Sequence, residues 1–325
     1  MRAVRAAPGP DAVGKVLTHD VGGVHKGTVL KPEHLRALAG AAELHLVELE
    51  PGDLHEDEAA RRLAAAIAGA GVETREPVQS QVRLTAARRG LFRADAAAID
   101  AMNAVGPLSV FTLVDGQAVE SGEEIAGAKV TPVAVPARLV EAAEEVAHAH
   151  APVVEVLAFR PLKTVVVATE KLKPKARELF RGAVTKKLGW YGAEQLGVHE
   201  VARSEAAVRA AYDDAARAGA ELILFAGASS IDPLDPAYQE LQAAGGEVMQ
   251  LGAPMHPGSM LWLGRLGAAP VLGVASCAGF GRSTSLDLVL PFVFAYGSAD
   301  PQHLRRLGPG GLIESGAGRR FPPYS

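Results

Sequence analysis

The stretch AELILFAGASSIDPLDPAYQELQAAG, residues 220–245, contains an apolar segment, a loop and an amphipathic segment in succession. Residues 222–225 are continuously apolar, as in a strand that is buried on both faces of a sheet. Residues 235–245 predict a helix, with Asp235 as its N-cap, Pro236 at its first position and glycine at its end. A strand that leads through a short loop into a helix is the repeating unit of a parallel α/β sheet. The stretch therefore predicts an α/β fold.

The same alternation of strand and helix continues through residues 153–300. Short apolar runs predict strands at 163–170, 194–201, 220–227, 246–253 and 270–276. Longer stretches with helical periodicity predict helices at 174–192, 204–219, 235–245 and 284–297. Residues 259–274 predict a hairpin that turns at Gly267. Together they predict a three-layer α/β domain with a mostly parallel sheet, covered by helices on both faces.

The N-terminal half has a different pattern, with shorter strands and more turns. Residues 1–75 predict an α+β leader region, in which residues 54–71 form a helix that acidic residues open and glycine closes. Residues 76–136 contain short strands divided by Asp-Gly, Ser-Gly and Ala-Gly turns, which predicts a β-rich, barrel-sandwich-like segment. Residues 116–127 resemble the turn–strand–turn of biotinyl or lipoyl half barrels in architecture only, because no lysine stands at the expected tip. Residues 301–325 are expected to form a C-terminal tail.

The composition of the 325 residues is that of an ordinary globular protein, with 48% hydrophobic and 22% charged residues. The net charge of −4 gives no reason to expect nucleic acid or an anionic membrane as a partner. No apolar run is long enough for a transmembrane helix, and the N-terminus lacks the apolar segment of a secretory signal. Cys277 is the only cysteine, which excludes an intrachain disulfide. We expect a cytoplasmic protein.

Small residues, hydroxyls and carboxylates follow the apolar strand residues 222–225. Gly227 lets a ligand approach the backbone closely, while Ser229 and Ser230 offer hydroxyl groups. Free N–H groups at the start of the next helix would favour a phosphate. Asp232 and Asp235 could hold Mg²⁺ through their oxygens, as metal ligands and catalytic groups. The alternative is structural: Asp235 would cap the helix, so the two interpretations compete mainly for Asp232.

Ligands of open α/β sheets bind at the carboxyl ends of the strands, where three predicted loops lie, after residues 168, 225 and 275. Cys277, in the third loop, could be a nucleophile if its pKa were lowered. The commoner role, which we favour, is a packed small side chain. Arg282, together with Ser283 and Thr284 near the start of the last helix, is a better candidate for anion binding.

The turn Pro257-Gly258 lies beside His256. A histidine in such a place could serve as an acid–base group or ligand, but a structural or solvated role is more usual. Trp262 is expected in the core rather than as a stacking platform. The sequence contains no metal-ligand cluster, P-loop or G-x-S-x-G elbow, so it gives no support for those kinds of site.

Three segments of the sequence are informative as a set: LILFAGASS (222–230), EVMQLGAPMHPGSMLWLGRLGAAPVLGVASCA (247–278) and TSLDLVLP (284–291). In this order and spacing they resemble the MoaB/Mog-like, molybdopterin-binding domain of molybdenum-cofactor biosynthesis proteins, over residues 155–297. The turn Met-His-Pro-Gly at 255–258 and the strand end Leu-Gly-Arg-Leu at 263–266 match the family pattern well. The front half also looks like the leader region of molybdopterin-binding proteins.

The resemblance implies a pterin-phosphate site built from several loops. With Arg282 and Ser283 added as anion-binding residues, the expected site residues are Thr169, Glu170, Gly227, Ala228, Ser229, Ser230, Pro257, Gly258, Ser276, Cys277, Ala278, Arg282 and Ser283. Asp232 and Asp235 would stand near the acidic positions that the family uses with magnesium. Three segments depart from the family. Ala-Thr-Glu-Lys at 168–171 replaces Thr-Gly-Asp-Glu, and Ser-Ile-Asp-Pro-Leu-Asp at 230–235 replaces Ser-Val-Gly-Asp-Tyr-Asp. Ala275-Ser276 replaces the proline expected after the family's next glycine.

A protein with this resemblance is expected to bind molybdopterin or the molybdenum cofactor, in its biosynthesis or delivery. The alternative is a magnesium-dependent transferase or insertase that acts on molybdopterin or its nucleotide. The altered acidic loop favours binding over catalysis. A hydrolase of another nucleotide, using Asp232 and Asp235, is a third alternative. The expected partners are the pterin ligand, other molybdenum-cofactor proteins and further copies of the chain in a homo-oligomer, with no nucleic acid and no membrane.

Overall fold

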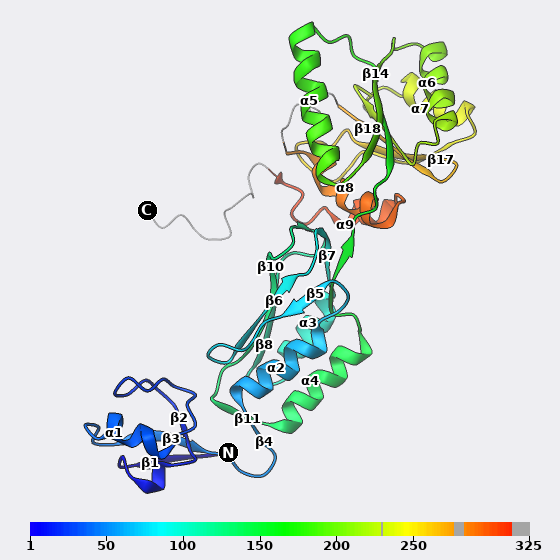
Figure 1. Cartoon of the computed structure of the whole chain (residues 1–325). Helices are drawn as coiled ribbons and strands as arrows, with labels where there is room; N and C mark the ends of the chain where they lie inside the picture. Colours follow the sequence, from blue (N-terminus) through cyan, green and yellow to red (C-terminus); the bar gives the residue numbers. More distant parts are fainter. Residues whose placement is uncertain (229, 276–282, 314–325) are drawn as a thin grey trace. The chain divides into compact units, whose positions relative to one another are not determined.

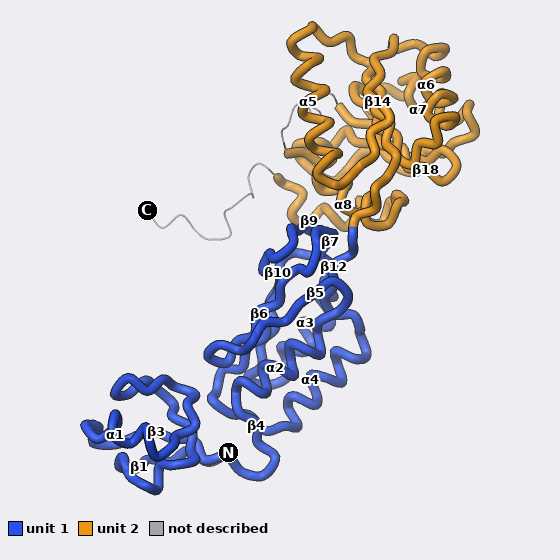
Figure 2. Tube along the Cα trace, in the orientation of Figure 1, with its two compact units in different colours: residues 1–158 blue, residues 159–325 orange. Residues whose placement is uncertain are grey.

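A computed structural model describes residues 1–228, 230–275 and 283–313 of the chain. The chain divides into two compact units, with the boundary between Ala158 and Phe159 (Figure 2). Each unit has two clusters of buried apolar side chains of its own. The second unit contains the three predicted ligand loops.

A six-stranded sheet forms the centre of the second unit (Figure 1). Its strands have the order β14-β13-β15-β18-β17-β16. The strands are β13 (Lys163–Ala168), β14 (Glu194–Glu200), β15 (Leu222–Ala226), β16 (Glu247–Leu251), β17 (Trp262–Leu266) and β18 (Ala269–Val274). The first four strands of the sheet order are parallel, and β17 and β16 are antiparallel to their neighbours. The predicted α/β class with a mostly parallel sheet is confirmed. The predicted hairpin of β17 and β18 turns at Gly267, whose φ of +59° favours glycine.

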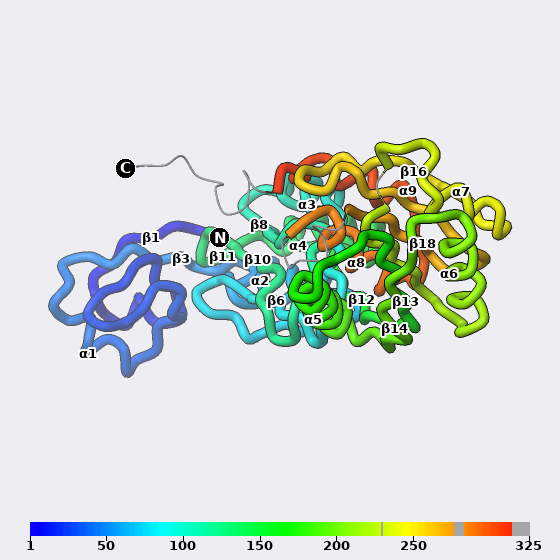
Figure 3. The backbone as a smooth tube through the Cα atoms, turned by 90° about the horizontal axis from the view of Figure 1, so that it is seen from above, coloured from blue at the N-terminus to red at the C-terminus, as the bar shows by residue number. Residues whose placement is uncertain are grey.

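Helices cover both faces of this sheet and complete three layers. They are α5 (Pro174–Trp190), α6 (Glu205–Arg217), α7 (Pro236–Ala243), α8 (Ser285–Tyr296) and the short α9 (Pro301–Arg306). Successive residues of β13 face opposite ways, so Val166 packs with α5 and α8 whereas Val165 packs with α6 and α7. Figure 3 shows α5 and α8 on one side of β13 and α6 on the other. Among the described residues, no helix has the length and apolar character needed to span a bilayer.

The first unit is β-rich and mixes strands with helices, as predicted for the leader region. Its strands are β1 (Arg2–Ala6), β2 (Val16–Leu17), β3 (Leu44–Glu48), β4 (Asp53–His55), β5 (Val72–Thr74), β6 (Gln81–Ala86), β7 (Gly90–Ala94), β8 (Leu108–Thr112), β9 (Ala118–Val119), β10 (Glu124–Val130), β11 (Ala134–Pro136) and β12 (Val154–Ala158). Its helices are α1 (Leu35–Leu38), α2 (Glu56–Ile67), α3 (Ala96–Asn103) and α4 (Ala137–Ala149), with short 3₁₀ turns at Pro10–Ala12 and Pro32–His34. The longest sheet, β5-β6-β10-β8, packs against α2.

Candidate functional site

Three loops leave the sheet at the carboxyl ends of β13, β15 and β18, and hydrogen bonds join them there. The backbone N–H of Thr169, which follows β13, donates to the carbonyl of Ala226 at 3.0 Å. The N–H of Gly227, which follows β15, donates to the carbonyl of Val274 at 2.8 Å. The loop starts that the sequence placed at one sheet edge therefore lie in direct contact.

Gly227 has no room for a side chain. Its φ is +91°, a conformation that favours glycine, and a Cβ atom there would lie 2.8 Å from Cγ of Glu170 and 3.1 Å from Oγ1 of Thr169. Three of the predicted site residues, Gly227, Thr169 and Glu170, are thus in contact with one another. Ala228, the next residue, is fully buried and belongs to the core beneath α6 and α7.

A cavity of about 150 Å³ lies beside these loops. Its walls are residues 256–261, the end of β18 at Val274 and Ala275, and the start of α8 at Thr284 and Ser285. The cavity therefore includes the predicted wall at Pro257 and Gly258. The loop that precedes α7 is attached to the same wall, because the N–H of Ser230 donates to the carbonyl of Met260 at 3.1 Å.

The start of α8 is tied to the Pro257-Gly258 turn. Ser285 donates its backbone N–H to the carbonyl of Pro257 at 3.1 Å and its hydroxyl to the carbonyl of Gly258 at 2.8 Å. A Cβ atom on Gly258, whose φ is +112°, would lie 2.2 Å from that hydroxyl oxygen. The turn needs glycine because the two segments approach so closely.

Thr284, which was expected to bind an anion together with Arg282 and Ser283, lines the cavity, and so does Ser285, which was not predicted as a site residue. Thr284 caps α8: its hydroxyl accepts the N–H of Leu286 at 3.3 Å, and the carboxylate of Asp287 accepts the N–H of Thr284 at 2.8 Å. The spacing Thr-x-x-Asp at 284–287 is a recognisable capping-box signal that could have identified Ser285 as the first residue of this helix. Lys187 of α5 forms an ion pair with Asp287 at 2.7 Å, which fixes this end of α8 against α5.

The structure confirms that Asp235 caps α7. Its carboxylate accepts the N–H of Ala237 at 2.8 Å, with Pro236 at the first position of α7. The same carboxylate pairs with Arg203, and only 1% of Asp235 is exposed. Burial raises the pKa of Tyr212 well above its usual value, and the nearby negative charge of Asp235 raises it further. One carboxylate oxygen of Asp235 thus accepts from Ala237 and the other from Arg203, so both oxygens are engaged within the protein.

Asp232, by contrast, is exposed, and its carboxylate accepts the N–H of Leu234 at 2.9 Å. Among the described residues, no three histidine, cysteine, aspartate or glutamate side chains are grouped as a metal site would require. The metal-binding and catalytic roles of Asp232 and Asp235 remain predictions.

Of the remaining predicted residues, three lie in the described part of the chain and five do not. Trp262 is fully buried and packs edge-on against Tyr238, as expected of a core residue, while the side chain of His256 is exposed. Ser283 is exposed just before α8. Five predicted site residues lie outside the described part of the chain: Ser229, Ser276, Cys277, Ala278 and Arg282.

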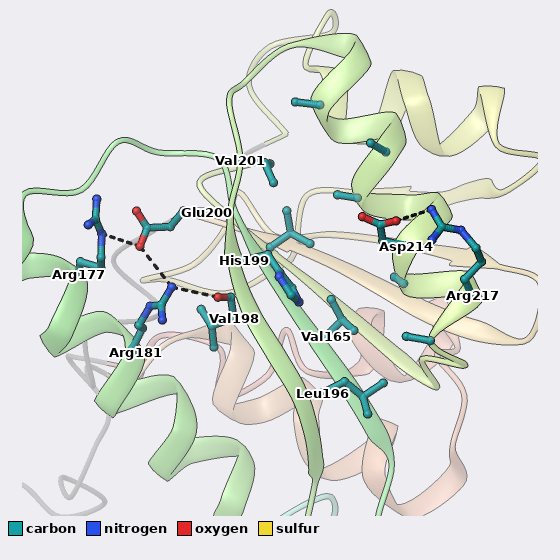
Figure 4. A pocket seen from close by; sticks show the side chains of 16 residues that line it. Val165, Arg177, Arg181, Leu196, Val198, His199, Glu200, Val201, Asp214 and Arg217 are labelled. Carbon is teal, nitrogen blue, oxygen red and sulfur yellow. Dashed lines mark hydrogen bonds and ion pairs between the residues drawn. The ribbon is translucent and has the colours of Figure 1, made fainter.

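A second hollow, of about 930 Å³, lies along β14 between α5 and α6 (Figure 4). Arg177 of α5 pairs with Glu200 at 2.6 Å, and Arg181 donates to the carbonyl of Val198 at 3.2 Å, so both arginines are directed to the edge strand. None of the predicted site residues lines this hollow. The smaller cavity at the carboxyl ends of the strands, where the loops converge, is the better candidate site.

Solved structures similar to this chain include several molybdenum-cofactor proteins. The molybdopterin biosynthesis Mog protein from Mycobacterium ulcerans shares 18% identity and a TM-score of 0.31, with 41% of this chain and 95% of that chain covered. A molybdenum cofactor biosynthesis protein from Corynebacterium diphtheriae shares 17% identity and a TM-score of 0.30, with 42% and 99% covered.

The molybdopterin biosynthesis MoeA protein from Pyrococcus horikosii covers more of the chain. It shares 15% identity and a TM-score of 0.30, with 79% of this chain and 81% of that chain covered. No protein-family model and no curated protein matches the chain. The chain is similar to MoaB/Mog-like proteins, and because the identities are so low its role has to be argued from its own residues.

Proposed function

We propose that the protein binds molybdopterin or the molybdenum cofactor through its terminal phosphate, and that it carries or delivers this ligand. One observation carries the proposal. Segments that resemble the molybdopterin-binding domain, at residues 256–261, at the end of β18 and at the start of α8, line a single cavity at the carboxyl end of β18. The loop after β15 is hydrogen-bonded to two of these lining residues, through Gly227 to Val274 and through Ser230 to Met260. Open α/β sheets bind ligands at this edge.

The size of the cavity limits what it can hold. Complete small-molecule sites commonly measure about 300–1,000 Å³, whereas the cavity beside Gly258 measures about 150 Å³. The cavity therefore suits one end of the ligand, and we assign it the phosphate. The pterin ring would extend from the cavity over the exposed surface beside Ser230 and Met260.

The polar groups around the cavity suit an anion. The hydroxyl of Thr284, at its wall, accepts the N–H of Leu286 and could donate its own hydrogen to a ligand, whereas the hydroxyl of Ser285 already donates to Gly258. The first-turn N–H groups of α8 already have acceptors within the protein, among them Pro257 and Thr284. The N–H groups of Gly227 and Ser230 are likewise engaged, with Val274 and Met260. A bound phosphate would therefore rely on side-chain hydroxyl groups, such as that of Thr284, and not on the first turn of α8.

The state of Asp235 favours binding over magnesium-dependent catalysis. Magnesium sites on proteins commonly use one or two carboxylates, together with substrate phosphates and water. Asp235 could join such a site only by giving up the N–H of Ala237 and the guanidinium of Arg203. Asp232 alone remains exposed to a cation, so a transferase or insertase that depends on both residues is the weaker alternative.

The carrier and enzyme roles differ in turnover. A carrier should bind molybdopterin and convert no adenylylated molybdopterin when magnesium and molybdate are supplied. Formation of the molybdenum cofactor in that assay, lost in Asp232→Asn with binding retained, would establish the insertase alternative. Absence of saturable molybdopterin binding would contradict both roles.

A further inference from the structure

Residues 311–313, which the sequence placed in a C-terminal tail, form a short strap beside the candidate cavity. The strap pairs with His256 as a parallel bridge. The N–H of His256 donates to the carbonyl of Gly311 at 2.7 Å, and the N–H of Ile313 donates to the carbonyl of His256 at 2.8 Å. His256 is a wall residue of the cavity, so the strap contacts the wall directly.

The strap and α8 hold the two sides of the same loop. On one side, Ser285 binds the carbonyls of Pro257 and Gly258. On the other side, both backbone bonds of His256 go to the strap. Loosening the strap would leave the wall attached mainly to α8, so its conformations would become more numerous and its fit to a ligand less well preorganised.

Gly311 fits this position because no side chain could. A Cβ atom there would lie 2.4 Å from the carbonyl oxygen of Pro254 and 2.8 Å from that of Leu307. By contrast, a Cβ atom on Gly308 would meet its nearest neighbours, Arg305 and Pro254, at 3.7 Å, an ordinary contact distance. The two glycines therefore offer a disruptive substitution and a matched harmless one.

The strap is held by backbone bonds more than by apolar burial. Leu312, its central residue, is 58% exposed, whereas Leu304 of the preceding α9 is buried in the core. A segment with few buried apolar contacts can open locally without unfolding the domain. Strap opening is therefore a separate equilibrium from the stability of the sheet.

We propose that the strap at residues 311–313 positions the His256–Pro257 wall of the cavity and thereby sets the affinity of the cavity for the phosphate end of its ligand. The part that concerns the ligand rests on the proposed function. Because coupling is reciprocal, a bound ligand would in turn hold the strap closed.

The first arm of the test needs no ligand. Hydrogen exchange is measured on the full chain for the N–H groups of Ala253 and Leu261, whose acceptors, Ser259 and Gly258, lie within the wall. Gly311→Val should speed their exchange about tenfold relative to the wild type, as expected from the loss of one to two hydrogen bonds. Gly308→Ala should leave it unchanged. Equal exchange in a folded Gly311→Val protein would overturn the proposal.

A second pair of variants guards against misfolding of Gly311→Val. Ile313→Pro removes the N–H that donates to His256, whereas Ile313→Val keeps it. Only the proline variant should speed exchange in the wall. If Gly311→Val does not fold, equal exchange in Ile313→Pro and the wild type overturns the proposal instead.

The second arm titrates the same variants with molybdopterin under anaerobic conditions. Gly311→Val and Ile313→Pro should bind about tenfold more weakly, with Gly308→Ala and Ile313→Val at wild-type affinity. Faster exchange with unchanged affinity would overturn the coupling to the ligand. If the wild type itself does not bind, the proposed function fails, and the exchange arm alone decides whether the strap positions the wall.

Discussion

The hydroxyl of Ser285 donates to the carbonyl of Gly258 across 2.8 Å, although the two residues lie 27 positions apart in the sequence. This bond joins the first turn of α8 to the turn that follows His256, and it closes one wall of the candidate cavity. The geometry leaves no space for a Cβ atom on Gly258. A single substitution at Gly258 can therefore show how much this contact contributes to the stability of the protein.

Gly258→Ala should destabilise the protein by more than about 2 kcal/mol, because it combines backbone strain with overpacking. The added Cβ would lie 2.2 Å from the hydroxyl oxygen of Ser285. Gly267→Ala is the matched control, since Gly267 also has a positive φ but nothing lies within 4 Å of its Cβ position. Its loss should be about 1 kcal/mol from strain alone. Equal losses in urea unfolding would show that the contact with Ser285 does not matter.

Gly227→Val should abolish molybdopterin binding in protein that remains folded. The side chain would clash with Glu170 and Thr169, and would so displace the loop from the position where the ligand is expected to approach its backbone. Gly245→Val controls for strain, because Gly245 has a φ of +82° and open space around it. Calorimetric titration of both variants and of the milder Gly227→Ala distinguishes the two effects. Wild-type affinity in Gly227→Val would remove this loop from the site.

Asp235→Ala should lower the free energy of unfolding by about 2–4 kcal/mol, because it removes a helix cap and leaves the charge of Arg203 without its buried partner. Asp232→Ala, at an exposed position, should change it by less than about 1 kcal/mol. Chemical denaturation of the two variants gives the comparison. A large loss for Asp232 with a small loss for Asp235 would contradict the structural role of the capping carboxylate.

Asp232→Asn tests for magnesium at the site. If a cation bridges this carboxylate to the ligand's phosphate, the variant should bind molybdopterin more weakly in magnesium and equally well in EDTA. Ser230→Ala is a suitable comparison, because loss of a hydroxyl should not depend on magnesium. If Asp232→Asn binds like the wild type in both buffers, the ligand is bound without a metal on this residue.

Glu56, in the first unit, should make stability depend on pH. It is buried, and burial raises the pKa of its carboxyl above the usual value, although Lys26, His55 and Lys129 oppose the shift and Asp57 adds to it. A carboxyl whose pKa is higher in the folded state favours folding below the unfolded pKa, and this contribution is lost as pH rises through the folded pKa.

The wild type should therefore lose stability as pH rises above about 4.5, the usual range for a glutamate. Glu56→Gln keeps the shape without the charge, and its stability should vary less over that interval. Thermal unfolding at a series of pH values compares the two proteins. Parallel pH profiles would show that Glu56 ionises without penalty in the fold.

Much of the second unit follows from local patterns in the sequence. Some features can be recognised from residues that are adjacent in the sequence: the apolar run at 222–225, the Asp235-Pro236 start of α7 and the hairpin turn at Gly267. The convergence of the loops followed from the rule that parallel strands end at one sheet edge.

Other features could not be found in this way, because they depend on contacts between distant segments. No local pattern indicates that Arg203 forms an ion pair with the carboxylate of Asp235, which was expected to be available for a metal. The strap at 311–313 binds His256 through backbone groups, which every residue carries, so its side chains give no signal. Thr284 and Asp287 did carry a capping signal.

The most direct test of the account is an anaerobic titration of the wild-type protein with molybdopterin and, in parallel, with its dephosphorylated form. If the cavity beside Gly258 and Ser285 holds the phosphate, molybdopterin should bind saturably at one site per chain. The dephosphorylated form should bind at least about tenfold more weakly, since hydrogen bonds to a charged group are worth about 1.5–3 kcal/mol. Equal affinity for the two forms, or no saturable binding of either, would contradict the central claim.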